Sequence, residues 1–273
     1  MKDLIQSIRE RKAILFAGAG LSMNLGLPSF GTLIDHLADE LGFDHDLFNI
    51  SGDYLSLAEY YFQQIGKLGP LRSWMDTTWH GSEVDISKSI IHKTIVELDF
   101  PTIYTTNYDR WIEKSYEYMN KEYSKIVNVA DLASTKNGVT EIIKFHGDFD
   151  DDDSMILTES SYFERMSFES PLDIKLRSDV LGKTILFIGY SLSDINIRYL
   201  LYKLQKQWEA TKFERVRPNS YIFLTKPNIV QEEILRSRGI DPIVSEIDDP
   251  KEALTTFLTK LLFEAYSKTI ETA

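Results

Sequence analysis

The sequence of 273 residues contains no cysteine. This absence excludes disulfide bonds, thiol nucleophiles and zinc sites built on thiolates. Histidine is also scarce, and the histidines form no H-E-x-x-H pair: they stand at His36, His45, His80, His92 and His146. We therefore expect neither a structural nor a catalytic metal.

Long hydrophobic runs are missing as well. No stretch approaches the ~18 uninterrupted apolar residues that a membrane helix requires. The charged N-terminal stretch MKDLIQSIRERK has neither the apolar segment nor the small-residue cleavage site of a signal peptide. We therefore expect a cytoplasmic protein without a membrane segment, and its 43% hydrophobic content is sufficient for a sizeable core.

Basic residues are outnumbered, with 30 Lys and Arg against 42 Asp and Glu, which gives a net charge of -12. A surface of that sign repels phosphate backbones, so direct nucleic-acid binding is not expected. Two alternatives stay open. One is a local basic patch around FERVRP, residues 213–218, and the other is a partner protein that carries the nucleic-acid contact.

Short apolar runs typical of buried strands recur along the chain. Several are continuously apolar, as in parallel sheets that are covered on both faces. Helical patterns lie between them, and the clearest span residues 193–210 and 250–268. This alternation predicts an α/β, doubly wound (Rossmann-like) fold with a mostly parallel six-stranded sheet. The six predicted strands are residues 13–18, 102–107, 141–147, 184–190, 220–225 and 241–247.

Residues 32–98 contain no convincing strand and show several successive helical patterns. The segment is too long for a plain crossover between strands. We therefore predict an inserted helical subdomain at 32–98 and a Rossmann domain formed by residues 1–31 and 99–273. The acidic run GDFDDDDS, residues 147–154, is interpreted as a solvated turn.

Polar motifs follow four of the predicted strands: GAGLS (18–22), TTNYD (105–109), FHGD (145–148) and GYSLSD (189–194). Ligands bind outside the carboxyl ends of parallel strands, and a glycine loop before a helix can hold a pyrophosphate. Met23 stands where G-x-G-x-x-G needs its third glycine, which argues against an ordinary dehydrogenase. Each motif alone has a structural alternative, such as a turn, a helix cap or a structural histidine. Four in succession favour a ligand site.

In this order the motifs resemble those of the sirtuin superfamily, over about residues 10–250. GAGLSMNLGLPSF is similar to the family's nucleotide loop, G-A-G-x-S followed by G-[IL]-P-x-F. TTNYD resembles T-Q-N-x-D, FHGD resembles H-G, and GYSLSD resembles the G-x-S that contacts the dinucleotide.

The departures from this family matter as much as the matches. Protein deacylases have D-F-R where this chain has Ser29-Phe30-Gly31, and Gln at the position of Thr106. Their four-cysteine zinc ribbon after H-G is replaced by FDDDDSMILTESSYFERM. The pattern H-G-D…L-T-E-x-x-Y, followed by G-Y-S-x-x-D-x-x-I-R-x-L, resembles the prokaryotic sirtuin-like branch of anti-phage defence, whose members hydrolyse NAD+.

The resemblance implies roles for individual residues. Asn107 would lie beside the ribose and orient a hydroxyl or the attacking water, and His146 would act as general base. Asp109 would fix Asn107 or the backbone around it, and Asp194 is equally plausible as a helix cap. The residues implied to contact the dinucleotide are Gly18, Ala19, Gly20, Ser22, Thr106, Asp109, Gly189, Ser191 and Asp194.

The function implied is an NAD+ glycohydrolase that releases nicotinamide and ADP-ribose and depletes NAD+ during infection, with NAD+ as substrate and no metal. Unregulated activity would kill the host, so we expect a homo-oligomer gated by a partner such as a HerA-type ATPase or a short Argonaute-like protein. Alternatives are a protein deacylase, an ADP-ribosyltransferase or a non-catalytic nucleotide-binding module. The missing zinc ribbon argues against deacylation, and the presence of both Asn107 and His146 argues against pure binding.

The predicted subdomain carries aromatic side chains on which a neighbouring subunit or partner would dock: Tyr60, Tyr61, Phe62, Trp74 and Trp79. Aromatic residues are common at the centre of interfaces. The alternative, that they form the subdomain's own core, stays open for each of them.

Overall fold

Parallel strands form the centre of the computed structural model, which describes residues 1–167, 169–190, 194–211 and 216–267. The sheet has seven strands in the order β3-β4-β2-β1-β5-β6-β7, and every neighbouring pair is parallel. The strands are β1 Ala13–Ala17, β2 Thr102–Thr105, β3 Tyr123–Ile126, β4 Thr140–Lys144, β5 Thr184–Ile188, β6 Ser220–Leu224 and β7 Ile240–Val244. The doubly wound fold is confirmed.

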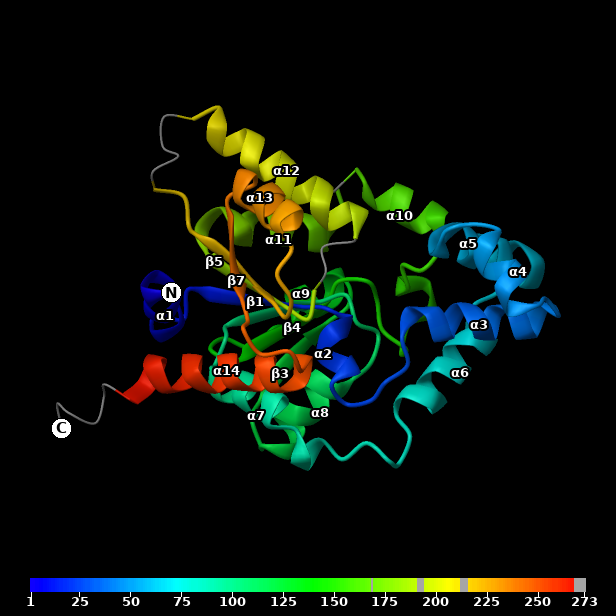
Figure 1. The fold of residues 1–273 in the computed structure, drawn as a ribbon, viewed down its shortest axis with the longest axis horizontal. Coiled ribbons are helices and arrows are strands. Elements are labelled where there is room, and N and C mark those ends of the chain that lie inside the picture. Colours follow the sequence, from blue (N-terminus) through cyan, green and yellow to red (C-terminus); the bar gives the residue numbers. More distant parts are fainter. Residues whose placement is uncertain (168, 191–193, 212–215, 268–273) are drawn as a thin grey trace.

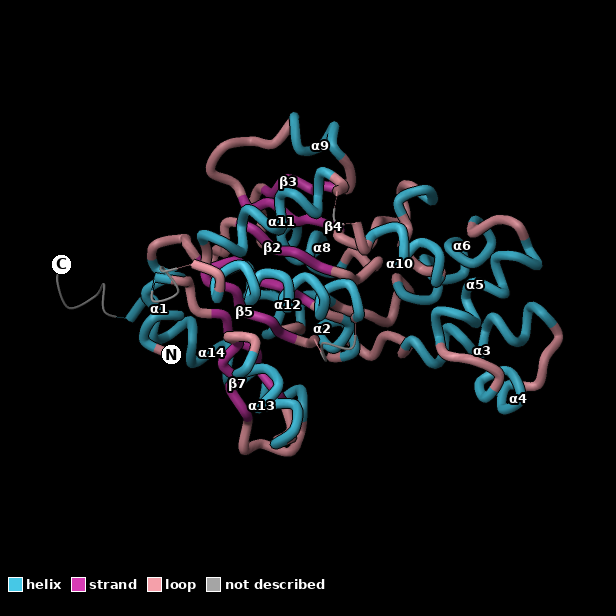
Figure 2. Tube along the Cα trace, turned by 90° about the horizontal axis from the view of Figure 1, so that it is seen from above, coloured by secondary structure: helices cyan, strands magenta, loops and turns pink. Residues whose placement is uncertain are grey.

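The predicted number of six strands is wrong, because β3 was missed. Its sequence YSKI has only one fully buried residue, Ile126, and it lies at the edge of the sheet, opposite β7 (Figure 2). A short, half-exposed edge strand has no continuous apolar run for a sequence pattern to detect.

Helices cover both faces of the sheet (Figure 1). On one face, α1 Lys2–Arg9, α7 Ile90–Glu97, α8 Trp111–Tyr118 and α14 Pro250–Tyr266 contribute to a core that includes Leu15 and Ile103. On the other, α11 Pro171–Gly182, α12 Ile195–Glu209 and α13 Ile229–Ser237 pack with Phe16 and Phe187. Successive residues of β1 therefore enter opposite cores, which explains why all five of its residues are buried.

A third core lies between helices at one end of the molecule (Figure 1, right). Ser29, Asp44 and Asp53 accept hydrogen bonds as N-caps of three of these helices. The helices are α3 Phe30–Leu41, α4 His45–Ile50, α5 Tyr54–Ile65 and α6 Gly69–Trp79, and α10 Glu159–Arg165 packs against α5. The short helices α2 Ala19–Met23 and α9 Val129–Ala133 and the 3-10 turns η1 Ile86–Lys88 and η2 Asp152–Ser154 complete the described elements.

The helix α7 lies within the predicted subdomain at 32–98, yet Ile91, Ile95 and Val96 pack in the sheet core with α14. The two-part division of the chain remains a proposal, and we propose that the helical subdomain ends before residue 90.

The aromatic residues of the subdomain divide between its core and its surface. Tyr61 and Trp79 are buried in the third core, whereas Tyr60 and Phe62 are exposed. Trp74 stacks on His36, with ring centroids 3.8 Å apart. Thus only part of this set is accessible to a partner.

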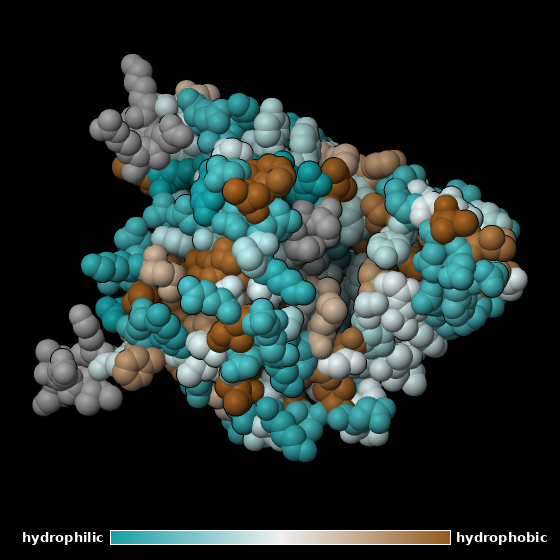
Figure 3. All heavy atoms as spheres, in the orientation of Figure 1, coloured by the Kyte–Doolittle hydropathy of each residue, from teal (hydrophilic) through white to brown (hydrophobic). Residues whose placement is uncertain are grey.

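Hydrophilic residues predominate on the face shown in Figure 3, and the hydrophobic residues there form small separate groups. None of the helices in the described ranges is long and apolar enough to cross a membrane. Half of the FERVRP stretch, residues 213–215, lies outside the described residues.

Candidate functional site

The loops that follow β1 and β5 pack directly against each other through glycine. The N–H of Gly18 donates to Ile188 O at 3.0 Å, and the N–H of Gly20 donates to Gly189 O at 2.8 Å. A Cβ on Gly18 would lie 2.5 Å from Gly189 O, and a Cβ on Gly20 would lie 2.9 Å from Gly189 Cα. These glycines therefore allow the close approach of the two loops. Any phosphate contact falls to other N–H groups of the loop, which begins α2 at Ala19.

Asn107 is held by the glycine loop from the neighbouring strand end. Its Nδ2 donates to Gly18 O at 3.1 Å and to Ser22 Oγ at 2.9 Å, and the Ser22 hydroxyl donates to Asp109 Oδ2 at 2.6 Å. Asp109 thus fixes Asn107 through Ser22. Because both amide protons are used within the protein, the amide oxygen is the atom that can accept a hydrogen bond from a ligand.

His146 lies at the adjacent strand end. Thr105 of β2 pairs with Lys144 of β4, and Asn107 and His146 each stand two residues beyond that pair. The structure therefore brings these two predicted residues to neighbouring loops at one edge of the sheet. Thr106, directly before Asn107 in the chain, is half-buried and lies near the hydroxyl of Tyr190.

The imidazole of His146 is almost completely buried, with 3% of the residue exposed. Its Nε2 lies 3.2 Å from Asp194 Oδ2 without a well-aligned hydrogen bond, and its Nδ1 lies 3.4 Å from the hydroxyl of Tyr162. Burial lowers the pKa of His146 to about 4, although the Asp194 carboxylate opposes the shift. The imidazole is therefore neutral at physiological pH and can accept a proton.

Asp194 has a double role in this arrangement. Its Oδ1 accepts hydrogen bonds from the N–H groups of Asn196 and Ile197 at the start of α12, so the helix-cap alternative is correct. Its Oδ2 faces His146, which sequence reasoning did not anticipate. Ser191, the other residue predicted in this loop, lies outside the described residues.

Two tyrosines of the site belong to motifs quoted in the sequence analysis but were not predicted as site residues. Tyr162 is the tyrosine of L-T-E-x-x-Y, and it lies edge-on to His146 with ring centroids 5.3 Å apart. Tyr190 follows Gly189, and its buried hydroxyl lies near Asp194 and Thr106 without a well-aligned hydrogen bond. Both tyrosines have a pKa raised by burial and by the Asp194 carboxylate, so they stay protonated and can donate.

The two most deeply buried histidines, His92 and His146, should make the protein sensitive to mild acid. Burial lowers the pKa of His92, like that of His146, to about 4. The pKa of histidine in the unfolded chain is about 6.5, so between pH ~4 and pH ~6.5 the folded state binds fewer protons than the unfolded state. The stability from these neutral imidazoles is fully present above pH 6.5 and is lost as the pH falls toward 4. At pH 5 we expect a loss on the order of 2 kcal/mol per histidine.

The measurement is the thermal midpoint at pH 7.5 and pH 5, for the wild-type chain and for His92→Gln. The thermal midpoint of His92→Gln should fall less between pH 7.5 and pH 5 than the midpoint of the wild type. An equal fall would remove His92 from the acid response.

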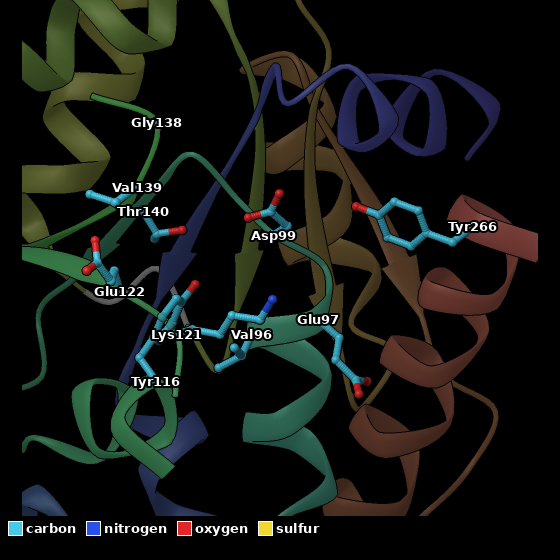
Figure 4. Close-up of a pocket in the computed structure, with 10 residues that line it drawn as sticks. All are labelled: Val96, Glu97, Asp99, Tyr116, Lys121, Glu122, Gly138, Val139, Thr140 and Tyr266. Carbon is cyan, nitrogen blue, oxygen red and sulfur yellow. The ribbon is translucent and has the colours of Figure 1, made fainter. Parts of the chain in front are cut away.

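A cavity among the described residues lies elsewhere, at the amino ends of β2 and β4 (Figure 4). It has a volume of about 530 Å³ and is lined by side chains that include Glu97, Asp99, Tyr116, Lys121 and Tyr266. Because strand-end ligands bind at the carboxyl ends of parallel strands, this cavity is separate from the candidate site. In the described part of the chain, no group of His, Asp or Glu is arranged to hold a metal ion.

Comparison with known proteins agrees with the geometry. A family model described as SIR2-like domain matches residues 101–243. The chain is 35% identical over 212 residues to NAD(+) hydrolase ThsA of Bacillus cereus (strain MSX-D12), covering 77% of this chain and 43% of that relative. It is 29% identical over 242 residues to Defense-associated sirtuin 2 of Bacillus subtilis, covering 86% of this chain and 23% of that relative. The chain thus spans less than half the length of these curated relatives.

Among solved structures, the crystal structure of a Sir2 homolog–NAD complex superposes with a TM-score of 0.55 at 12% identity. The superposition covers 98% of this chain and 94% of that one. At this identity the likeness supports the fold alone.

Proposed function

Because this chain belongs to the SIR2-like domain family, we propose that it is an NAD+ glycohydrolase, which cleaves the nicotinamide–ribose bond to give nicotinamide and ADP-ribose. The observation that carries the proposal is the placement of Asn107 and a neutral, buried His146 on adjacent strand ends. The names of the relatives, NAD(+) hydrolase and defense-associated sirtuin, support it.

In this proposal the reaction passes through a transition state with positive charge on the ribose. The amide oxygen of Asn107 accepts a hydrogen bond from a ribose hydroxyl or from the attacking water. In the neutral imidazole of His146 the Nε2–H faces the Asp194 carboxylate, which orients the ring. Nδ1, 3.4 Å from the Tyr162 hydroxyl, is then the atom that accepts the released proton. The glycine loop, residues 18–22, would hold the pyrophosphate through N–H groups other than those of Gly18 and Gly20, with Thr106, Gly189 and Ser191 beside the dinucleotide.

The test is incubation of the purified chain with NAD+, followed by separation of the products. Nicotinamide and free ADP-ribose in equal amounts support hydrolysis. Label from NAD+ on protein would instead support ADP-ribosyl transfer, and removal of acyl groups from lysine would support deacylation.

We also propose that NAD+ depletion by this chain serves anti-phage defence and that assembly controls it, with a homo-oligomer and a HerA-type ATPase or short Argonaute-like partner. The named defence role of a relative supports the first part. The second part rests on the family resemblance and on the harm that uncontrolled NAD+ cleavage would do to a cell.

We expect NAD+ turnover per subunit to rise with protein concentration and to change when the protein products of neighbouring genes are added. The measurement is turnover over a concentration series, alone and with those proteins. Full activity in a monomer, at every concentration and with no response to any of them, would contradict control by assembly.

A further inference from the structure

A fully buried lysine lies beneath the two loops that carry the candidate catalytic residues. Lys144, the last residue of β4, has no exposed surface. Its Nζ donates to the main-chain carbonyl of Tyr108 at 3.3 Å and to that of Asp109. It lies 3.3 Å from Glu113 Oε1 and 3.9 Å from Asp148 Oδ2. An ammonium group buried this deeply is tolerated only because these partners replace water.

These contacts join the two candidate loops. The carbonyls that Lys144 binds belong to the two residues that follow Asn107, so the ammonium group fixes the backbone of that loop from inside the protein. In the other loop, Lys144 stands two residues before His146, and the carboxylate of Asp148 stands two residues after it. One side chain therefore contacts the loops on both sides of the proposed reaction centre.

The acidic run at 147–154, interpreted from the sequence as a solvated turn, takes part in this arrangement. Asp148 is completely buried, and its Oδ1 lies 3.4 Å from Lys125 Nζ. Gly147 adopts φ +95°, which turns the chain so that Asp148 points inward. The solvated-turn interpretation is therefore wrong for Asp148, and its charge is shared between Lys125 and Lys144.

We propose that Lys144 is a positioning residue for NAD+ cleavage, which sets the Asn107 loop against the His146 loop without touching the substrate. The proposal rests on the proposed hydrolase function. Small displacements of a catalytic group reduce rates strongly, because a shift of about 1 Å can lower turnover about 100-fold.

The experiment separates positioning from simple stability by removing the buried charge pair as a unit. Lys144→Met alone leaves Glu113 buried without its cation, so it should lower the thermal midpoint. The double variant Lys144→Met with Glu113→Leu removes both charges, and Asp148 keeps Lys125. We expect its midpoint to recover while its kcat stays about 10- to 100-fold below the wild type, with KM for NAD+ changed about threefold or less.

Two further variants complete the test. Lys125 is the other cation beside Asp148, and it donates to neither of the two loop carbonyls. The variant Lys125→Met should therefore keep a wild-type kcat. Glu113→Gln keeps Lys144 and its carbonyl contacts, so it should retain activity even if stability falls. Wild-type kcat in a folded double variant would overturn the proposal. If the double variant does not fold, a kcat in Glu113→Gln as low as in Lys144→Met would overturn it equally.

A readout independent of turnover distinguishes failure of this proposal from failure of the hydrolase function. The Nδ2 protons of Asn107 are hydrogen-bonded within the protein, so their NMR signals should be protected from exchange with water. The signals can be assigned by their loss in Asn107→Ala. We expect the protection to disappear in the double variant and to persist in Lys125→Met. Protection that persists in the double variant would overturn the positioning role, whether or not the wild-type chain cleaves NAD+.

Discussion

Replacement of either Asn107 or His146 by alanine should lower NAD+ turnover by about 10²- to 10⁴-fold, the range expected when a positioned acid–base group is lost. Binding of NAD+ should change far less, because the glycine loop and the β5 loop remain packed together. Asn107→Ala removes the amide oxygen that we propose accepts a hydrogen bond from the ribose or the attacking water. His146→Ala removes the proposed base, and the hydroxyl of Tyr162 loses its contact with Nδ1.

Turnover and NAD+ binding should be measured separately for both variants. His45→Ala and Asn49→Ala are suitable controls, since both side chains lie in α4, away from the strand-end loops. The pH profile gives an independent readout: the acidic limb of wild-type kcat/KM should fall near pH 4, because burial lowers the pKa of His146 to about 4. Near-normal turnover in a folded variant would remove that residue from the mechanism, and an acidic limb near pH 6.5 would contradict the lowered pKa of His146.

Gly147→Ala should destabilise the protein and abolish most of its activity. A Cβ at this position would overlap the Ser154 carbonyl and lie 2.8 Å from Met155 Cα, and the φ of +95° adds strain for any L-residue. The atoms of Ser154 and Met155 that the Cβ would meet belong to the backbone, so they cannot move aside as the end of a flexible side chain would. Overpacking of this kind typically costs about 1–3 kcal/mol, and the strained backbone adds of order 1 kcal/mol.

The matched control is Gly138→Ala, since Gly138 has φ +84° but a Cβ there meets nothing within 4 Å. Both variants place alanine in the left-handed region, and only one lacks space. We expect the control to lose roughly 1 kcal/mol and keep its NAD+ turnover. The measurements are the urea midpoint and turnover at a concentration of denaturant where the wild type is folded. Equal loss of stability in the two variants would show that backbone strain, and not the contact with Ser154, sets the requirement for glycine.

The fold was largely predictable from the sequence, because its central strands are continuous apolar runs. AILFA and TILFI are buried at every position. Their continuous apolar run can be recognised from the segment itself, without knowledge of the rest of the chain. Elements at the periphery were not predictable in the same way. The strand YSKI and the helix HDLFNI are short and partly exposed, so local periodicity is too weak to detect them.

For the site, the sequence identified the polar residues that directly follow a predicted strand, because their place in the chain is enough to predict that they lie at a strand end. It could not identify partners that meet only after folding. Tyr162 contacts His146 from α10, and Asp194 contacts it from the start of α12. Lys144 was the hardest to foresee, because a lysine at the end of an apolar run is ordinarily solvated, and its burial depends on Glu113 of α8.

The position of β1 in the sheet also determines when this strand can find its partners during synthesis. β1 pairs with β2 on one side and β5 on the other, and residues 18–101 separate it from the nearer partner in sequence. At ~5–20 residues per second, the ribosome needs roughly 4 to 17 s before β2 emerges. Throughout that time the nascent chain exposes AILFA, a short segment without charge or proline of the kind that associates between chains. We therefore expect the yield of folded protein to depend on chaperones that cover this segment until β2 emerges.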